Sequence, residues 1–338
     1  MQFFVWIKKH VFYWNLSLKI GVALLLCWAL YQQLLGRVDA SSLWTSLYQL
    51  SIGPSNWYVF LVLLLMPLNW ILEAVKWQML IPKAHRVSGN KAIWAIFSGV
   101  TFSIFTPNRT GDYLGRILLV KAESNWNVFA ATVAGNICQL IALLSFGWLG
   151  LLYYTQNTLT ISWQDYKVFL IITCLGTIFL FLSLLYIRRI IQWFGKWRFL
   201  QKFHLNLQGY LEVFASYSYK TLLKALGWAA LRYWVYALQY LLMLHFAQIE
   251  VDIITGFAGI ATIFLVQSSI PLPPALGLLA RGEIALLIWG PYSDDPIRIL
   301  AASFGLFIIN LTLPALLGLV AIARVNILKS LGYEKNKY

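Results

Sequence analysis

Long apolar stretches recur along the whole chain, and they restrict the folds it can adopt more than any other feature. A helix needs about 20 apolar residues to cross the hydrocarbon core of a membrane. Six stretches reach or approach that length: 18–35, 56–75, 128–154, 167–187, 225–247 and 298–322. Because backbone groups at membrane depth must be satisfied within the protein, such stretches span as helices. The sequence therefore predicts an all-α polytopic membrane protein, with residues 1–338 forming one integral membrane domain.

The scarcity of charge supports this class. Hydrophobic residues make up 60% of the chain and charged residues 11%, whereas soluble domains carry about 25% charged residues. These values exclude a soluble enzyme, a disordered protein and a disulfide-stapled secreted module. The three cysteines (Cys27, Cys138 and Cys174) lie in apolar stretches without the spacing of a metal or redox site, so no metal and no cofactor is expected.

Basic residues are distributed unevenly between the two sets of connecting segments. Nineteen of the 26 lysines and arginines, Lys76 among them, fall on one side of the predicted spans. An excess of positive charge marks cytoplasmic segments, so both termini are predicted to be cytoplasmic. The basic, aromatic segment 188–224 is expected to be amphipathic and to lie on the cytoplasmic membrane surface. Because the basic segments alternate with apolar spans, they indicate topology and no nucleic-acid partner.

Two further apolar regions are interrupted near their middle. Region 92–120 is broken at 106–109, and region 253–290 is broken at 271–274. The charge bias holds if each region enters and leaves on one face, which predicts two re-entrant helical hairpins. Residues 56–154 and 225–322 would then be two inverted halves, as in many secondary transporters. The alternative is that each region crosses twice as short kinked helices, which would give eight spans.

Seven charged residues remain at membrane depth after the connecting segments are set aside, and five of them fall on the two broken hairpins. Charge at that depth is costly and persists where it lines a cavity or binds a ligand. The seven residues are Glu73, Arg109, Asp112, Arg116, Arg232, Arg281 and Glu283. Glu73 and Lys76, three residues apart at the end of a span, are interpreted as a snorkelling pair near the cytoplasmic face.

The first hairpin combines a helix break with three charges. Pro107 ends the incoming helix, and either Asn108 or Thr110 can cap the outgoing one. Arg109, Asp112 and Arg116 follow at positions i, i+3 and i+7 and share one helix face. A helix N-terminus beside an arginine suits a phosphate group, and Asp112 can orient either arginine. The alternative is a structural ion pair that holds the hairpin together.

Small residues on both hairpins permit close packing. Gly111 and Gly115 form a small-xxx-small pair that allows a helix or an acyl chain to approach. On the second hairpin the prolines suit the start of a helix, and small residues lead to an acid that is either coupled to protonation or paired with Arg109, Arg116 or Arg232. This set comprises Pro271, Pro273, Pro274, Gly277, Arg281 and Glu283. Arg232 and Gln239, on the preceding span, are expected to face the same cavity.

The run from Pro107 to Arg116 resembles the P-x-R-x-G-[DE]-x-x-R signature of the lysylphosphatidylglycerol synthase transmembrane region, or flippase-like domain. The run from Pro271 to Glu283 is similar to a later signature of that family. The resemblance covers about residues 15–325 and implies a bacterial or archaeal membrane protein that moves a lipid between leaflets. Family members often carry an arginine and an acid early in the helix after the first hairpin, where residues 135–139 are neutral in this chain.

These observations favour a lipid translocase of the bacterial inner membrane over an enzyme. Its substrate would be an anionic or modified phospholipid or a polyprenyl-linked lipid, bound at the two hairpin tips. The predicted substrate-binding residues are Asn108, Arg109, Asp112, Arg116, Arg232, Gln239, Arg281 and Glu283. The alternatives are an intramembrane enzyme acting on a lipid phosphate, such as a glycosyl transferase, and a membrane partner of a separate lipid-modifying enzyme. A homodimer is compatible with all three of these functions. The common ATPase and hydrolase motifs are not found in the sequence.

Overall fold

All elements in the described part of the chain are helices. The computed structural model describes residues 55–82, 87–104, 106, 109–120, 125–158, 163–186, 216–269 and 277–325, and positions 21, 24, 48, 53, 189 and 193. The first predicted span and most of the predicted interfacial segment lie outside these residues, as do Pro107, Asn108, Pro271, Pro273 and Pro274. No site assignment that depends on those five positions is tested by the structure.

The helices agree closely with the apolar stretches. They are α4 (Asn56–Leu80), α5 (Gly89–Ser103), α6 (Gly111–Leu118), α7 (Asn125–Thr158), α8 (Trp163–Leu185), α12 (Tyr219–Phe246), α13 (Ile253–Ser269), α14 (Gly277–Trp289), η4 (Gly290–Tyr292), α15 (Pro296–Phe307), η5 (Ile308–Thr312) and α16 (Leu313–Ala323). Three described helical segments are long and apolar enough to cross a membrane: Asn56–Leu80, Asn127–Gln156 and Pro296–Ala323. The prediction of an all-α polytopic membrane protein is confirmed.

The first broken region folds as an antiparallel pair of short helices. Gly115 on α6 faces Ser98 and Gly99 on α5, and Gly111 faces the backbone of Phe102. A side chain at either glycine would collide with the α5 backbone, so the small residues let the two helices touch directly. Gly111 and Gly115 therefore pack against α5, the other helix of the same hairpin.

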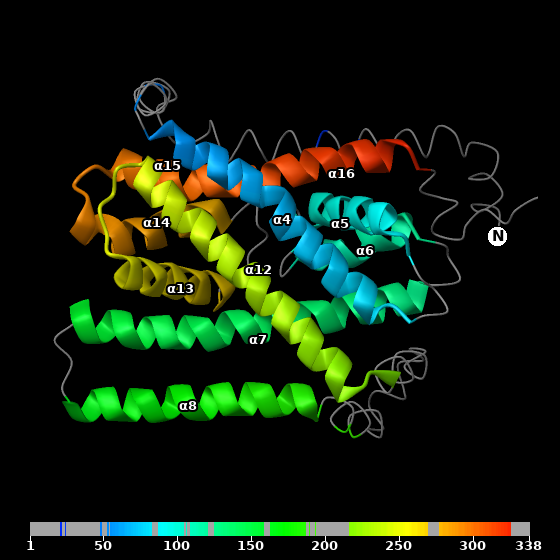
Figure 1. Ribbon diagram of the computed structural model, residues 1–338, viewed down its shortest axis with the longest axis horizontal. Coiled ribbons are helices and arrows are strands. Elements are labelled where there is room, and N and C mark those ends of the chain that lie inside the picture. Colours follow the sequence, from blue (N-terminus) through cyan, green and yellow to red (C-terminus); the bar gives the residue numbers. More distant parts are fainter. Residues whose placement is uncertain are drawn as a thin grey trace, which may run out of the picture.

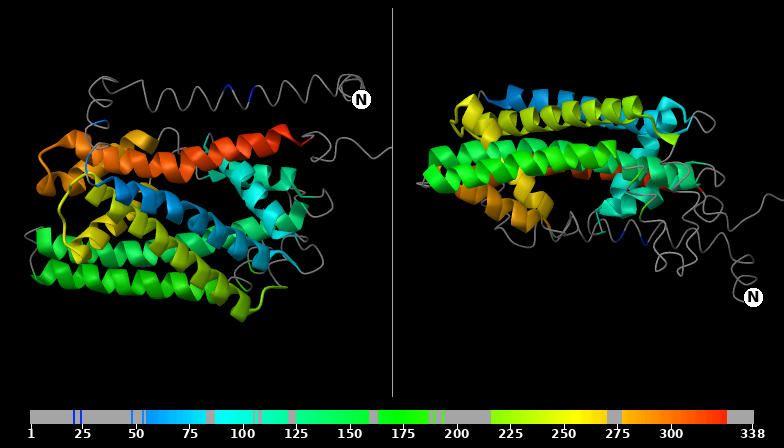
Figure 2. Two further views of the ribbon diagram at one scale, coloured as in Figure 1. Left: turned by 45° about the horizontal axis from the view of Figure 1, so that its top comes forward. Right: turned by 90° about the horizontal axis from the view of Figure 1, so that it is seen from below.

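The two hairpins lie at opposite ends of the molecule. Figure 1 shows α5 and α6 at the end where α4 finishes and α7 starts, and α13 and α14 at the other end. In each hairpin the second helix runs back toward the end from which the first helix started. α8 lies along the edge beside α7 (Figures 1 and 2).

Each hairpin packs against the long helix that follows the other hairpin. α5 packs on α16, where Gly318 meets the Phe97 carbonyl and Thr101 Oγ1 donates to the Ala315 carbonyl at 2.7 Å. α13 packs on α7, where Gly150 lies against the backbone of Ala258. Small residues at both contacts give close van der Waals packing, which is the main source of helix association in a bilayer. Each hairpin is therefore held in place by a helix from the other half of the chain.

A π-helical segment interrupts the last long helix. Residues Ile308–Thr312 form this segment, η5, and Pro314 follows it at the start of α16. Proline lacks an N–H group and clashes with the carbonyl four residues earlier, and a π turn is one way in which a helix accommodates such a disruption. The segment contains Asn310, which is buried and takes part in the polar network described next.

Candidate functional site

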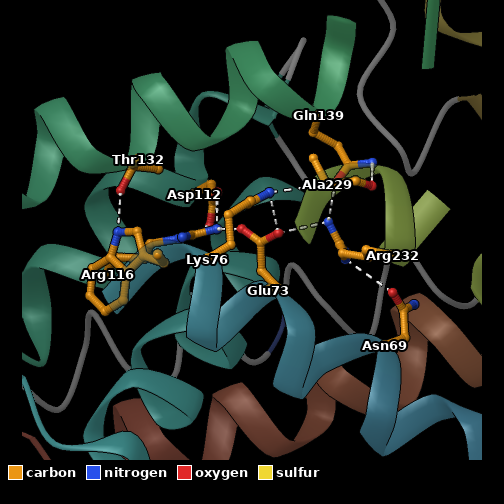
Figure 3. A network of polar contacts seen from close by, with 10 residues as sticks. Asn69, Glu73, Lys76, Asp112, Arg116, Thr132, Gln139, Ala229 and Arg232 are labelled. Carbon is orange, nitrogen blue, oxygen red and sulfur yellow. Dashed lines mark hydrogen bonds and ion pairs between the residues drawn. The ribbon is translucent and has the colours of Figure 1, made fainter. Parts of the chain in front are cut away.

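Glu73 lies at the centre of a buried network of charged side chains. Its carboxylate, on α4, is 2% exposed and pairs with three cations from three helices. Oε2 lies 2.6 Å from Lys76 Nζ and 2.9 Å from Arg232 Nη1, and Oε1 lies 3.0 Å from Arg116 Nη2 (Figure 3). The network therefore joins α4, α6 and α12 through a single carboxylate.

Arg116 is held from two sides. Asp112, one turn earlier on α6, accepts hydrogen bonds from Nε and Nη2 of Arg116, each at 2.8 Å. The guanidinium also lies 5.3 Å from the ring centroid of Trp77, whose indole N–H donates to Thr132 Oγ1. A bidentate pair and a cation–π contact fix both the position and the plane of an arginine. Of the two arginines on this hairpin, Arg116 is the one that pairs with Asp112.

Arg232 connects the network to the π segment. Its Nε donates to Asn69 Oδ1 at 3.0 Å, and Asn69 Nδ2 donates to Asn310 Oδ1 at 3.0 Å. Its guanidinium also lies 5.0 Å from the ring centroid of Trp70. The chain of contacts therefore runs from Glu73 across α12 and α4 to the last long helix, which lies in the other half of the sequence.

Gln139 on α7 completes the network with a neutral side chain. Its Oε1 lies 3.4 Å from both Lys76 Nζ and Arg232 Nη1, and its Nε2 donates to the Ala229 carbonyl at 3.4 Å. Gln139 therefore offers a neutral amide oxygen, and not a carboxylate, to two cations.

The interpretation of Glu73 and Lys76 as a snorkelling pair is wrong. Both side chains are buried, Lys76 completely, and Lys76 belongs to the network and is not one of the topology-setting charges. The spacing of an ion pair near a span end cannot distinguish a surface pair from a buried one. The missed signal was a polar stripe of Asn69, Glu73 and Lys76, which lie on one face of an otherwise apolar helix.

Two other expectations also differ from the geometry. Gln239 is fully buried, and its Nε2 donates to the Val62 carbonyl of α4 at 2.9 Å, so its described contact is with a helix backbone. Thr106 accepts the hydrogen bond from the Gly111 N–H at 2.7 Å, while the N-cap residue Thr110 makes no side-chain cap bond. The α6 N-terminus is therefore capped by a residue from the end of the incoming segment.

Arg109 and Arg281, one from each hairpin, form a second group of cations. Arg109 is exposed and has a φ of 59°, a left-handed conformation that costs a non-glycine residue about 1–3 kcal/mol and recurs at functional sites. Arg281 is half-buried, with its guanidinium 5.1 Å from the ring centroid of Phe307. Asp112 is the strongest charged neighbour of Arg109, followed by Arg281 and Tyr236. Within the described residues, neither has a carboxylate at ion-pair distance.

The charges do not balance across the site. Glu73 and Asp112 face Lys76, Arg116 and Arg232, which leaves one positive charge in excess before the two tip arginines are added. Glu283, on α14, was predicted to bind the substrate, but it is exposed and makes no ion pair with the network. An excess of arginine charge favours an anionic ligand such as a phosphate. The described residues contain no group of three or more metal-ligating side chains of the His, Cys, Asp or Glu type.

The fold and this buried site define a polytopic helical membrane protein with an excess of positive charge at its centre. Residues 16–318 match the family described as the lysylphosphatidylglycerol synthase TM region, and the chain belongs to this family. The family is a membrane domain associated with lipid-related function. No match was found among curated proteins or solved structures.

Proposed function

We propose that the chain is a lipid translocase that moves an anionic or modified phospholipid, or a polyprenyl-linked lipid, between leaflets. The observation that carries this proposal is the excess of positive charge: Glu73 and Asp112 face three cations, and Arg109 and Arg281, one on each broken hairpin, make no ion pair among the described residues. Arginine binds phosphate oxygens bidentately, so two such side chains suit the head group of an anionic lipid. The hydrocarbon chains would stay in the bilayer.

The Glu73 network supplies the support for this site. Arg116, fully engaged by Asp112 and Glu73, positions the α6 hairpin and is not the principal ligand. Arg232 ties the same carboxylate to the second half of the chain. We propose that the residues 56–154 and 225–322 act as two inverted halves, which rock about the central site while the head group crosses. Because α5 packs on α16 and α13 packs on α7, each hairpin would move with the long helix of the other half.

A proteoliposome assay tests the proposal. Fluorescent phosphatidylglycerol is incorporated on one side, and its exposure to a membrane-impermeant reductant is followed for wild type, Arg109→Ala and Arg281→Ala. A hydrogen bond involving a charged group contributes about 1.5–3 kcal/mol, so each variant is expected to bind the head group about tenfold more weakly or worse. Arg298→Ala is the matched control, because Arg298 pairs with Asp295 outside the network.

Two outcomes would contradict the assignment. Transfer at the wild-type rate in stable Arg109→Ala and Arg281→Ala proteins would remove the tip arginines from the site. Detection of a covalently altered lipid by mass spectrometry would favour the intramembrane enzyme. Transfer of unaltered lipid that falls in both variants and persists in Arg298→Ala is the expected result.

A further inference from the structure

Lys76 is the lysine of the Glu73 network, and its side chain is fully buried on α4. Its Nζ has two acceptors among the described residues: Glu73 Oε2 at 2.6 Å and Gln139 Oε1 at 3.4 Å (Figure 3). A charged lysine carries three N–H donors, whereas a neutral amine carries two. Within the part of the chain that the structure describes, the contacts of Lys76 therefore satisfy every donor of the neutral form and leave one donor of the charged form without an acceptor.

The charge balance of the network depends on the same proton. Its two carboxylates face three cations from α4, α6 and α12, namely Lys76, Arg116 and Arg232. Arginine stays protonated in proteins, and protonation of either carboxylate would only increase the positive excess. Among these five groups, the loss of a proton from Lys76 is thus the one ionisation that makes the network neutral. Glu73 would keep both of its guanidinium partners, at 2.9 and 3.0 Å.

Two further titratable groups lie near Lys76, and both stand apart from the network. α7 passes beside the lysine at Gly135 and places Cys138 in its vicinity. The Cys138 thiol takes part in none of the described hydrogen bonds of the network. Tyr217, before the start of α12, donates its hydroxyl to the Leu80 carbonyl at 2.8 Å. Lys76 is therefore the group through which the network can exchange a proton.

Glu73 and Asp112 connect the charge of Lys76 to the first hairpin tip. Both acids are charged neighbours of Arg109, and both also pair with Arg116. Two events can offset the positive excess: the release of the Lys76 proton and the binding of an anionic head group. Because both act on the same excess charge, each is expected to weaken the other, and this coupling is reciprocal.

We propose that Lys76 is a proton-exchange site, where the protein takes up a proton when it binds an anionic lipid head group and releases it when the head group leaves. In the release step the Nζ–H bond breaks, the electron pair stays on Nζ, and the proton passes to water. This inference rests on the proposed function, because it takes an anionic lipid as the ligand. It adds to that function a proton whose binding is coupled to that of the lipid.

The pH dependence of binding of a soluble anionic lipid tests this site. Dihexanoyl phosphatidylglycerol is titrated into the detergent-solubilised protein between about pH 5 and about pH 10, the range in which lysines in proteins titrate. Calorimetry in two buffers of different ionisation enthalpy counts the protons taken up. Raising the pH removes the proton and one positive charge, so we expect the affinity of the wild type to fall about fivefold or more across this range.

Variants at position 76 separate the proton from a structural role. Lys76→Met fixes the charge at zero, and Lys76→Arg fixes it at one, so both are expected to lose the pH dependence and the proton uptake, with the arginine variant binding more tightly. Lys220→Met is the control for a lysine exposed on α12, and Cys138→Ala is the control for the neighbouring thiol; both are expected to keep the wild-type dependence. A wild-type dependence in Lys76→Met, or its loss in Cys138→Ala, would overturn the inference.

The leaflet-transfer assay distinguishes failure of this inference from failure of the proposed function. Binding by the wild type that is independent of pH and takes up no proton, with leaflet transfer intact, would overturn the inference and retain the translocase. Proton-linked binding without leaflet transfer would retain the role of Lys76 and refute the translocase. Failure of the wild type to bind phosphatidylglycerol at any pH would overturn both.

Discussion

Replacing Glu73 by glutamine removes the carboxylate on which three buried cations converge. Lys76, Arg116 and Arg232 lie within 2.6–3.0 Å of its two oxygens. Glutamine has nearly the same shape, so the substitution changes charge with little change in packing. The local excess of positive charge rises by one, and Asp112 remains as the only carboxylate in the network. The variant therefore isolates the electrostatic contribution of the central acid.

The expected loss of stability is large. Removing one partner from a buried ion pair costs about 3–5 kcal/mol, because the other partner is left uncompensated. The glutamine carbonyl can still accept one hydrogen bond, so we expect about 3 kcal/mol, at the lower end of that range. In a chain of this size such a change lowers the melting temperature by roughly 4 °C.

Thermal unfolding in detergent, followed by the fluorescence of the 16 tryptophans, measures this effect. Glu250→Gln is the control, because Glu250 is an exposed acid outside the network. Adding Lys76→Met to Glu73→Gln removes one uncompensated cation, so the double variant is expected to recover part of the loss. Equal melting temperatures for Glu73→Gln and Glu250→Gln would refute the view that Glu73 holds the network together.

Three further predictions concern packing, capping and topology. Gly318→Ala is expected to destabilise the protein by about 1–3 kcal/mol, because an added methyl group collides with the α5 backbone. Gly227→Ala is the control, because nothing lies within 4 Å of the added methyl group, and it should be neutral or stabilising by up to about 1 kcal/mol. Thermal unfolding of both variants measures the difference. Thr106→Val removes the acceptor of the first α6 amide and should cost about 1 kcal/mol, and an unchanged melting temperature would argue against this cap. In a cysteine-free background, Arg189→Cys should react with an impermeant maleimide only from the cytoplasmic side and Glu250→Cys only from the opposite side, and the reverse pattern would invert the predicted topology.

The hairpin breaks were predictable because they depend on local covalent chemistry. Pro107 and the polar residues around it predicted an interruption at 106–109, and α5 ends at Ser103 while α6 begins at Gly111. The Asp112–Arg116 pair was also predictable, since residues one helical turn apart share a face. The cap was harder to predict, because Thr106 reaches across the break and is not adjacent to the first residue of α6.

The membrane class, the two helix breaks and the arginines within apolar stretches could be read from the sequence, because apolar length and local breaks depend on neighbouring residues alone. Which acid holds the network depends on how distant helices pack. Glu73 meets Arg232, 159 positions away in the chain, and Gln139 completes the cluster from a fourth helix. Such pairings follow from how α4, α6, α7 and α12 pack against one another, and neither hydropathy nor helical spacing contains that information.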